Sequence, residues 1–433
     1  MNYWKREIET IGRDELAALQ LERLKQTVVR AGGSEYYRGV FRKAGLGPDS
    51  LNSLDDLRRF PFTSKEDLRS AYPRAMLAVD REEVVRMHAS SGTTGQSTVV
   101  YHNARDLDNW TELLARCLVM AGATRRDVFQ NMMSYGLFTG GLGLHYGAER
   151  VGMMVIPIGG GNTHRQIQFF RDFGTTIIHI TPSYALHVSD VIRDLDLSPE
   201  DFRLRVLIFG AEPYSEATRE KLERLYRVRA LNCYGLSEMN GPGVAFECGM
   251  SEGMHVWEDS YIVEVIDPDS GERLPPGEEG EVVFTTLNRE AMPLIRYRSR
   301  DLARLYRGTD CSCGRNFQRL SRIVGRTDDM LIVRGVNIFP SQIEHELMRI
   351  PEVGTNYQIV LDRVENLDRM TVRVEITGQT FHGEVGELRL LKKKIQHALK
   401  EEILISTEIE LMEPGALPPS QGKAKRVIDN REM

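Results

Sequence analysis

The sequence has no long run of apolar residues. None of its 433 residues falls in a stretch of roughly 18 consecutive apolar side chains, so a membrane-spanning helix is not expected. The first 25 residues, MNYWKREIETIGRDELAALQLERLK, are charged and helix-like, and they lack the apolar core of a secretory signal peptide. We therefore expect a cytoplasmic protein with no membrane contact.

Cysteine and surplus positive charge are also scarce. Five cysteines, an odd number, fit a reducing cytosol better than a disulfide framework. The formal net charge of -6 gives no overall basic field, so nucleic acid is not an expected partner. The length and the 41% hydrophobic content are enough for two domains with a sizeable core.

Short apolar segments alternate with helical patterns from about residue 84 to residue 240. The segments that predict strands are 84–87, 128–132, 153–156, 176–180 and 205–209. Ser215 follows the last of them and is a residue type that caps the start of a helix. Nearly continuous apolar strands separated by helices predict a sheet that is buried on both faces.

The pattern changes near residue 260. Segments 261–266 and 282–285 predict antiparallel strands joined by Pro/Gly-rich turns, and apolar residues from Val385 to Ile403 follow a helical spacing. We predict an α/β protein with two domains. A large N-terminal domain, residues 1–327, has layered β-sheets with helices and a small antiparallel β region, and a small mobile α+β domain follows, residues 328–433.

The stretch 88–100, HASSGTTGQSTVV, has the composition of a loop that holds phosphate. Glycines let the backbone approach an anion, and backbone N–H groups and hydroxyls can donate to it. The lysine of a GxxxxGK[ST] phosphate loop is absent. Taken alone, the stretch could equally be an ordinary polar turn.

Further motifs follow in order along the chain. They are YGLSE at 234–238, YRSRD at 297–301, GRTDD at 325–329, RG at 334–335 and GK at 422–423. This ordered set resembles the adenylate-forming superfamily of acyl-CoA synthetases. SSGTTGQSTVVYH, SYGLFTGGLGLHYGAERVG, FGAEPYS, CYGLSEMNGPG, GRTDDMLIVRGVNIFPSQIE and PPSQGKAKRVIDNR resemble its phenylacetate–CoA ligase branch, and the resemblance runs from about Phe60 to Arg431.

The resemblance implies a ligase that works in two steps. A small-molecule carboxylic acid attacks the α-phosphorus of ATP, pyrophosphate leaves and an acyl-adenylate remains. A thiol, usually that of coenzyme A, then displaces AMP. The first step needs charge stabilisation at the phosphates, which Mg²⁺ and protein donors would supply.

Residues at the matching positions take implied roles in nucleotide binding. The implied set is Ser90, Ser91, Gly92, Thr93, Thr94, Gly95, Ala211, Glu212, Pro213, Tyr234, Gly235, Ser237, Asp301 and Arg326. The first six would hold the β and γ phosphates. Tyr234 offers a ring for adenine to stack on, and Asp301 can accept from both ribose hydroxyls. Glu238 is a carboxylate suited to Mg²⁺.

Two more implied roles concern the C-terminal domain. Lys423 would stabilise charge that grows during adenylation; Lys425 is its rival, and an exposed tail lysine is the alternative for either. Asp328 resembles the hinge about which the small domain swings between an adenylating and a thioester-forming pose. After the swing, Arg334 and Gly335 would approach coenzyme A, unless they form a plain surface loop.

Four residues have the chemistry of a zinc site, namely Cys248, His255, Cys311 and Cys313. Three thiolates and one imidazole would form a closed tetrahedral site, which makes the expected role of Zn²⁺ structural. Their spacing is not that of a standard zinc finger, so reduced cysteines without metal stay the alternative.

The segment 131–141 matches the region that lines the aryl pocket in this branch. The implied pocket residues are Met133, Tyr135, Phe138, Gly140 and Gly141. Met133 departs from a position that is often aromatic, and a flexible methionine can reshape a pocket; plain core filling is its alternative role. The expected substrate is an aryl or arylacetic acid similar to phenylacetate.

Two other functions stay open from the sequence. An adenylyltransferase of the coenzyme F390 synthetase type resembles this branch and has the same motifs. A catalytically silent binding protein with this fold is the second, although Glu238, Asp301, Arg326 and Lys423 argue against it. A homodimer is the candidate assembly.

Overall fold

The computed structural model describes residues 2–89, 98–137, 139–250, 253–308, 311–334, 336–364, 367–378, 380, 385–418 and 426–431. Contacts between residues group the chain into two compact units, each built from two separate segments. The first unit is Met1–Gly159 with Leu231–Ile323, and the second is Gly160–Ala230 with Val324–Met433. The domain boundary between residues 327 and 328 stays a prediction.

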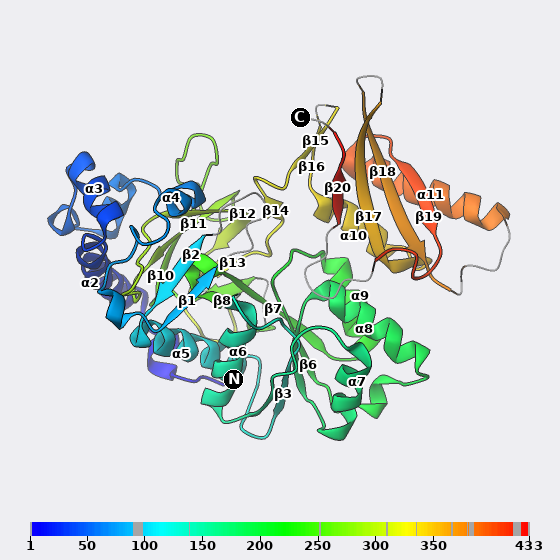
Figure 1. The fold of residues 1–433 in the computed structure, drawn as a ribbon, viewed down its shortest axis with the longest axis horizontal. Coiled ribbons are helices and arrows are strands. Elements are labelled where there is room, and N and C mark those ends of the chain that lie inside the picture. Colours follow the sequence, from blue (N-terminus) through cyan, green and yellow to red (C-terminus); the bar gives the residue numbers. More distant parts are fainter. Residues whose placement is uncertain are drawn as a thin grey trace. The chain divides into compact units, whose positions relative to one another are not determined.

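An antiparallel sheet forms much of the first unit (Figure 1). Its strands are β7 (Arg229–Leu236), β8 (Gly241–Glu247), β9 (Met254–Val256), β10 (Tyr261–Ile266), β11 (Glu279–Thr286), β12 (Tyr297–Tyr306) and β13 (Arg319–Leu320). They lie in the order β10-β11-β12-β13-β9-β8-β7. The antiparallel pair predicted at 261–266 and 282–285 is confirmed, with Tyr261 opposite Thr286.

Two smaller strand pairs belong to the same unit. Strand β1 (Arg86–Ala89) pairs antiparallel with β2 (Val99–His102), so the phosphate-loop sequence joins two strands of a hairpin. Strand β3 (Val128–Asn131) pairs parallel with β4 (Met154–Ile156), which confirms the strands predicted there. The α-helices described in this unit are α1 (Arg6–Glu9), α2 (Arg13–Ala31), α3 (Glu35–Ala44), α4 (Lys65–Ser70), α5 (Ala104–Met120) and α6 (Thr139–Val151).

Glycines let α6 pack closely against α5. A Cβ atom on Gly143 would lie 2.5 Å from the Trp110 ring, and one on Gly147 would lie 2.6 Å from Leu114 Cβ. No side chain fits at either position without a shift of the neighbouring helix. The close packing fixes the start of α6, where Thr139 lies beside residues of the candidate site.

The first segment of the second unit has parallel strands and three helices. The parallel strands β5 (Ile177–Ile180) and β6 (Val206–Phe209) are buried along their full length, as the continuous apolar sequence predicts. The helices are α7 (Thr163–Asp172), α8 (Pro182–Asp194) and α9 (Glu216–Tyr226). The predicted cap of α9 is confirmed, because the Ser215 side chain accepts from the backbone N–H of Thr218.

The second segment of this unit is an α+β structure (Figure 1). It contains β14 (Gly325–Arg326), β15 (Leu331–Val333), β16 (Val336–Ile338), α10 (Pro340–Arg349), β17 (Val353–Val364), β18 (Leu367–Ile376), α11 (Val385–Ile403), β19 (Glu408–Met412) and β20 (Val427–Asp429). The main sheet has the order β19-β18-β17-β20. The predicted helix is confirmed as α11, with Leu391, Ile395 and Leu399 buried. No helix in the described ranges has the length and apolar character needed to span a bilayer.

Replacement of Gly147 by alanine tests the packing of α5 against α6. The new methyl would lie 2.9 Å from the carbonyl carbon of Leu114. Because a backbone atom cannot rotate away as a side chain can, we expect the free energy of unfolding to fall by about 1–3 kcal/mol. Gly386, in α11, is the control because no atom lies within 4 Å of its added Cβ. Gly386→Ala should stabilise by about 0.5–1 kcal/mol. The measurement is thermal unfolding followed by circular dichroism. Melting of both variants at the temperature of the parent would contradict this packing.

Candidate active site

Several predicted site residues lie outside the described residues. They are Ser90, Ser91, Gly92, Thr93, Thr94, Gly95, Phe138, Gly335 and Lys423. Their roles stay predictions. The remaining candidates divide between the two units.

A tight turn between β7 and β8 carries Glu238. A Cβ atom on Gly235 would lie 1.9 Å from the carbonyl oxygen of Gly241, so only glycine fits where the chain returns on itself. The strand register shifts at the same point. The turn continues through a short 3-10 segment, Ser237–Met239, to Asn240, whose φ is 78°. This geometry buries the Glu238 side chain at the point of chain reversal.

Tyr234 and Asp301 lie side by side in the sheet of the first unit. The Tyr234 hydroxyl donates to Asp301 Oδ2 at 2.5 Å, and both side chains are buried. The Tyr234 ring stacks on Phe284 with centroids 6.0 Å apart. The residues expected to bind adenine and ribose therefore form one rigid pair, although they are 67 positions apart in the sequence.

Hydroxyl groups from two other elements approach the turn. The Thr98 hydroxyl lies 3.5 Å from Glu238 Oε1, and Thr98 is the first described residue after the phosphate-loop sequence. The hydroxyls of Ser237 and Thr139 lie 3.4 Å apart. Glu238 is thus tied to the hairpin that carries the loop, and Ser237 is tied to the start of α6.

The predicted pocket segment folds into a compact group. Asn131 Nδ2 donates to the Tyr135 hydroxyl at 2.9 Å and to the Gly141 carbonyl at 2.6 Å. Burial raises the pKa of Tyr135 to about 12, so its phenol is neutral at physiological pH. A Cβ atom on Gly140 would lie 3.5 Å from Met133 Cε, which places Met133 directly beside this glycine. The apolar Met133 side chain therefore lies beside Gly140, and Tyr135, whose hydroxyl is fixed by Asn131, lies beside Gly141.

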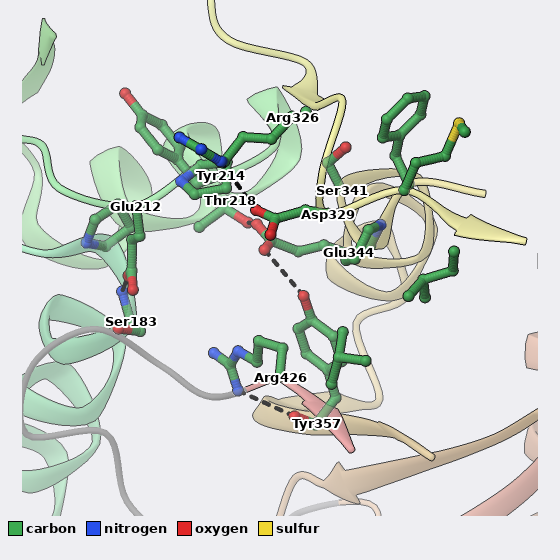
Figure 2. Close-up of a pocket in the computed structure, with 18 of the residues that line it drawn as sticks. Ser183, Glu212, Tyr214, Thr218, Arg326, Asp329, Ser341, Glu344, Tyr357 and Arg426 are labelled. Atoms are coloured by element: carbon green, nitrogen blue, oxygen red, sulfur yellow. Dashed lines mark hydrogen bonds and ion pairs between the residues drawn. The ribbon is translucent and has the colours of Figure 1, made fainter. Parts of the chain in front are cut away.

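In the second unit, Ala211, Glu212 and Pro213 follow β6. Ala211 has a φ of 72°, a left-handed conformation that is costly for a residue with a side chain. Glu212 Oε1 accepts from the backbone N–H of Ser183 at 2.7 Å, in the first turn of α8. A cavity of about 450 Å³ opens beside Glu212, and Arg326, Asp328 and Glu344 also line it (Figure 2).

Arg326 and Asp328 are bonded to each other. Arg326 Nε lies 2.8 Å from Asp328 Oδ1, and Arg326 Nη2 lies 3.0 Å from Asp328 Oδ2. The expected nucleotide-binding arginine and the expected hinge aspartate, two residues apart, therefore share a bidentate ion pair. A backbone rotation at Asp328 would change the position of the Arg326 guanidinium. Arg334, an expected coenzyme A contact, donates to the Asp368 carbonyl at 2.8 Å.

Glu344 is an important residue of this unit that the sequence analysis missed. Its Oε1 accepts from the Ser215 backbone N–H at 3.0 Å and from the Thr218 hydroxyl at 2.5 Å, and its Oε2 accepts from the Tyr357 hydroxyl at 3.1 Å (Figure 2). A carboxylate is favourable at the N-terminus of a helix, here α9. No local pattern could have indicated this contact, since 126 positions separate Glu344 from Thr218.

A second contact strengthens the same packing. Lys221, on α9, donates to the carbonyls of Val353 and Gly354 at 3.2 and 3.1 Å. Burial lowers the pKa of Lys221 to about 8. Together with Glu344, this lysine joins α9 to α10 and to the start of β17.

The four predicted zinc ligands come together in the first unit. They are Cys248, His255, Cys311 and Cys313; all four are buried, and their ligand atoms lie within 4.8 Å of one another. Cys248 Sγ lies 3.6 Å from Cys311 Sγ, and Cys313 Sγ lies 3.2 Å from His255 Nε2. The hydrogen bonds from Cys248 and from His255 lower the pKa of the Cys313 thiol.

The surroundings of this cluster also suit a metal. His255 Nδ1 lies 3.2 Å from the Phe317 carbonyl, an arrangement that directs Nε2 toward the thiols. The N-terminal segment, which the sequence analysis did not connect with the cluster, packs over it. Tyr3 donates to the Cys313 carbonyl at 2.7 Å, and Arg315 binds the buried Glu9 carboxylate at 2.9 and 2.6 Å. The turn at 311–315 is therefore held from both sides.

Comparison with known proteins gives consistent results over the whole chain. The sequence profile of the AMP-binding enzymes matches residues 41–288, and that of the AMP-binding enzyme C-terminal domain matches residues 335–431. The phenylacetate-coenzyme A ligases of Pseudomonas putida, Escherichia coli strain K12 and Thermus thermophilus are 46%, 46% and 45% identical. Each alignment covers 98% of this chain, and it covers 96%, 97% and 99% of the respective relative.

Solved structures agree with the sequence relatives. A 2-hydroxyisobutyryl-CoA ligase in its postadenylation state, in complex with an R3-HIB-AMP adenylate, has a TM-score of 0.93 at 29% identity, over 99% of this chain and 92% of its own. The same ligase in its thioesterification state, in complex with 2-HIB-AMP and CoA, has a TM-score of 0.73 at 31% identity, over 99% of this chain and 93% of its own.

Substitution of Glu344 by glutamine tests the contact at α9. The amide keeps the size but loses the charge, and its NH₂ group cannot accept from the surrounding donors, so we expect a loss of about 1–3 kcal/mol at this contact. Hydrogen exchange should then be roughly 10- to 100-fold faster at the amides of residues 215–218. Glu410→Gln, which removes an exposed partner of Arg373, is the control. Equal exchange in both variants would contradict the role of Glu344.

Proposed function

The chain belongs to the phenylacetate–coenzyme A ligase branch of the AMP-binding enzymes, and on that premise we propose that its acid substrate is an aryl or arylacetic acid similar to phenylacetate. The protein is an AMP-forming acid–CoA ligase. It adenylates a carboxylic acid with ATP, releases pyrophosphate and transfers the acyl group to coenzyme A. Identity of 45–46% to whole-length ligases carries this conclusion.

The arrangement of residues 131–141 supports an aromatic acid. A Cβ atom on Gly140 would lie 3.5 Å from Met133 Cε, so the buried, apolar Met133 side chain lies directly beside this glycine. Tyr135 is held in place by Asn131 and by His145, whose Nδ1 lies 3.1 Å from the phenol oxygen. A flat ring would contact the apolar side, and the fixed hydroxyl would orient the acid. Phe138 would complete the pocket.

In this proposal, Tyr234 and Asp301 of the first unit bind adenosine. Ala211, Glu212, Pro213 and Arg326, all in the second unit, keep the nucleotide-binding role that the family resemblance implies. The Ser90–Gly95 segment would bind the phosphates, and Lys423 would stabilise the charge that develops at the α-phosphate. The buried Glu238 carboxylate and the neighbouring Thr98 hydroxyl are oxygen donors of the kind that Mg²⁺ prefers. Bound Mg²⁺ would neutralise phosphate charge.

A hinge at Asp328 would let one site serve both steps. In the second step, Arg334 and Gly335 would face coenzyme A. The ion pair between Arg326 and Asp328 supports this role, because it couples a nucleotide-binding side chain to the hinge. The cytoplasmic location and the homodimer stay predictions.

A panel of carboxylic acids tests the substrate class. Purified enzyme is incubated with ATP, Mg²⁺ and each acid, with and without coenzyme A, and pyrophosphate and thioester are both measured. We expect phenylacetate and related aryl acids to exceed short aliphatic acids by at least about tenfold in kcat/KM, the scale of a lost apolar contact. A preference for aliphatic acids would overturn the proposal. Adenylate that forms but never reacts with coenzyme A would favour the adenylyltransferase alternative.

Lys423→Ala separates the two steps in the same assay. Removal of one charge-stabilising group should lower the rate of adenylation by a factor of roughly 10²–10³. Thioester formation from supplied acyl-adenylate should continue at the rate of the parent enzyme. Equal losses in both steps would show that Lys423 has no specific role in adenylation.

We also propose that the cluster of Cys248, His255, Cys311 and Cys313 holds one structural zinc ion. Four buried donors within 4.8 Å of one another match the closed tetrahedral sites that zinc adopts. The ion would connect the β8–β9 region to the segment before β13. Because the N-terminal segment packs on that turn through Tyr3 and Arg315, metal loading would also support the docking of residues 2–11.

Metal analysis tests the zinc proposal directly. We expect about one zinc per chain in protein purified without chelator, and a loss of this zinc in Cys311→Ser. Cys117→Ser, which alters a buried thiol outside the cluster, should keep the metal. Limited proteolysis should cleave the N-terminal segment faster when zinc is absent. Native protein with no bound metal would rule the site out.

A further inference from the structure

Arg289 is a buried cation that the motifs do not explain. It lies in the connection between β11 and β12, and its side chain is only 2% exposed. One guanidinium nitrogen, Nη1, donates to the backbone carbonyl of Glu238. The other two, Nε and Nη2, are buried and have no hydrogen-bond partner among the described residues.

Nearby carboxylates act on this cation without bonding to it. Within the described part of the chain, Arg289 forms no ion pair with either Asp106 or Glu238, although both act on its pKa. The Asp106 carboxylate is engaged by the backbone N–H groups of Glu290 and Ala291, at 2.7 and 3.0 Å. Two of its guanidinium N–H groups are therefore left without a bonded carboxylate among the described residues.

Arg289 also lies near the base of the hairpin that carries the phosphate-loop sequence. Burial lowers the pKa of His88 and of His102, and the nearby charge of Arg289 lowers both further. The two rings lie 5.6 Å apart, on β1 and β2. His88 lies two residues before Ser90, and Thr98 connects the returning strand to Glu238. The Arg289 guanidinium thus lies near the histidines of this hairpin and is bonded to the backbone of the expected magnesium ligand.

The energetic cost indicates an anionic ligand. A buried charge without a partner costs several kcal/mol, and buried arginines are nearly always paired. Two buried N–H donors in a rigid plane match the oxygens of a phosphate group. The loop sequence lacks the lysine that a GxxxxGK[ST] loop would place on the phosphates, so a fixed cation is needed at this end of the site.

We propose that Arg289 binds the departing pyrophosphate. Its Nη1–H fixes the backbone of Glu238, while its Nε–H and Nη2–H donate to a phosphate oxygen of ATP and then of pyrophosphate. Arg289 replaces the missing loop lysine from a distant part of the sequence. The inference rests on the proposed roles of Glu238 and of the Ser90–Gly95 segment.

Calorimetry with inorganic pyrophosphate and Mg²⁺ tests this role without any acid or coenzyme A. Arg289→Lys keeps the charge but loses the planar pair of donors, and we expect pyrophosphate to bind roughly 10- to 100-fold more weakly, the scale of one or two charge-assisted hydrogen bonds. Arg296→Lys is the matched control, because Arg296 is equally buried but bonded to Glu264 at 3.0 and 3.1 Å. Unchanged affinity in Arg289→Lys, or equal losses in both variants, would overturn the proposal.

Two further measurements keep the test decisive. With supplied acyl-adenylate, Arg289→Lys should slow the reverse reaction with pyrophosphate by the same factor. If neither Arg289→Lys nor Arg289→Gln folds, hydrogen exchange of residues 287–296 in the parent protein replaces them. Added magnesium pyrophosphate should then slow exchange there, and no change would overturn the proposal. An acid panel that failed would leave these pyrophosphate results intact.

Discussion

The hydrogen bond from the buried Arg289 guanidinium to the backbone carbonyl of Glu238 fixes the turn on which the candidate site is built. Close contact between Gly235 and Gly241 leaves this turn little freedom, and Tyr234 just before it is bonded to Asp301. The candidate nucleotide-binding residues Tyr234, Gly235 and Ser237 therefore stand on β7 and the turn that follows it, whose positions are set by packing. Preorganised donors of this kind stabilise developing charge without rearranging during the reaction.

This arrangement changes how the missing loop lysine is understood. In a GxxxxGK[ST] loop, the loop itself brings the cation to a phosphate that is transferred. In the proposed site, the phosphate at the hairpin would be the one that leaves, and its cation would be the buried Arg289, bonded to the backbone of Glu238. A fixed, desolvated guanidinium without a partner lowers the stability of the folded protein. Binding of the anion would offset that loss, so nucleotide binding and folding stability would be linked at Arg289.

The sequence was a good guide wherever the determinants are local. Continuous apolar runs predicted β5 and β6, and Ser215 predicted the start of α9. The short YGLSE motif at 234–238 identified Tyr234 and Glu238 as candidate site residues. It could not predict contacts between distant segments. Arg289 and Glu238 are 51 positions apart, Glu344 and Thr218 are 126 apart, and no periodicity connects them. The two compact units are each built from two separate segments of the chain, and the domain boundary between residues 327 and 328 stays a prediction.

The most direct test of this account is a crystal structure of the ligase with Mg²⁺ and pyrophosphate bound. The account predicts a phosphate oxygen within hydrogen-bonding distance, about 2.7–3.2 Å, of Arg289 Nε or Nη2, with Mg²⁺ on the Glu238 carboxylate. A pyrophosphate bound elsewhere, with ordered water on both free nitrogens of Arg289, would contradict it.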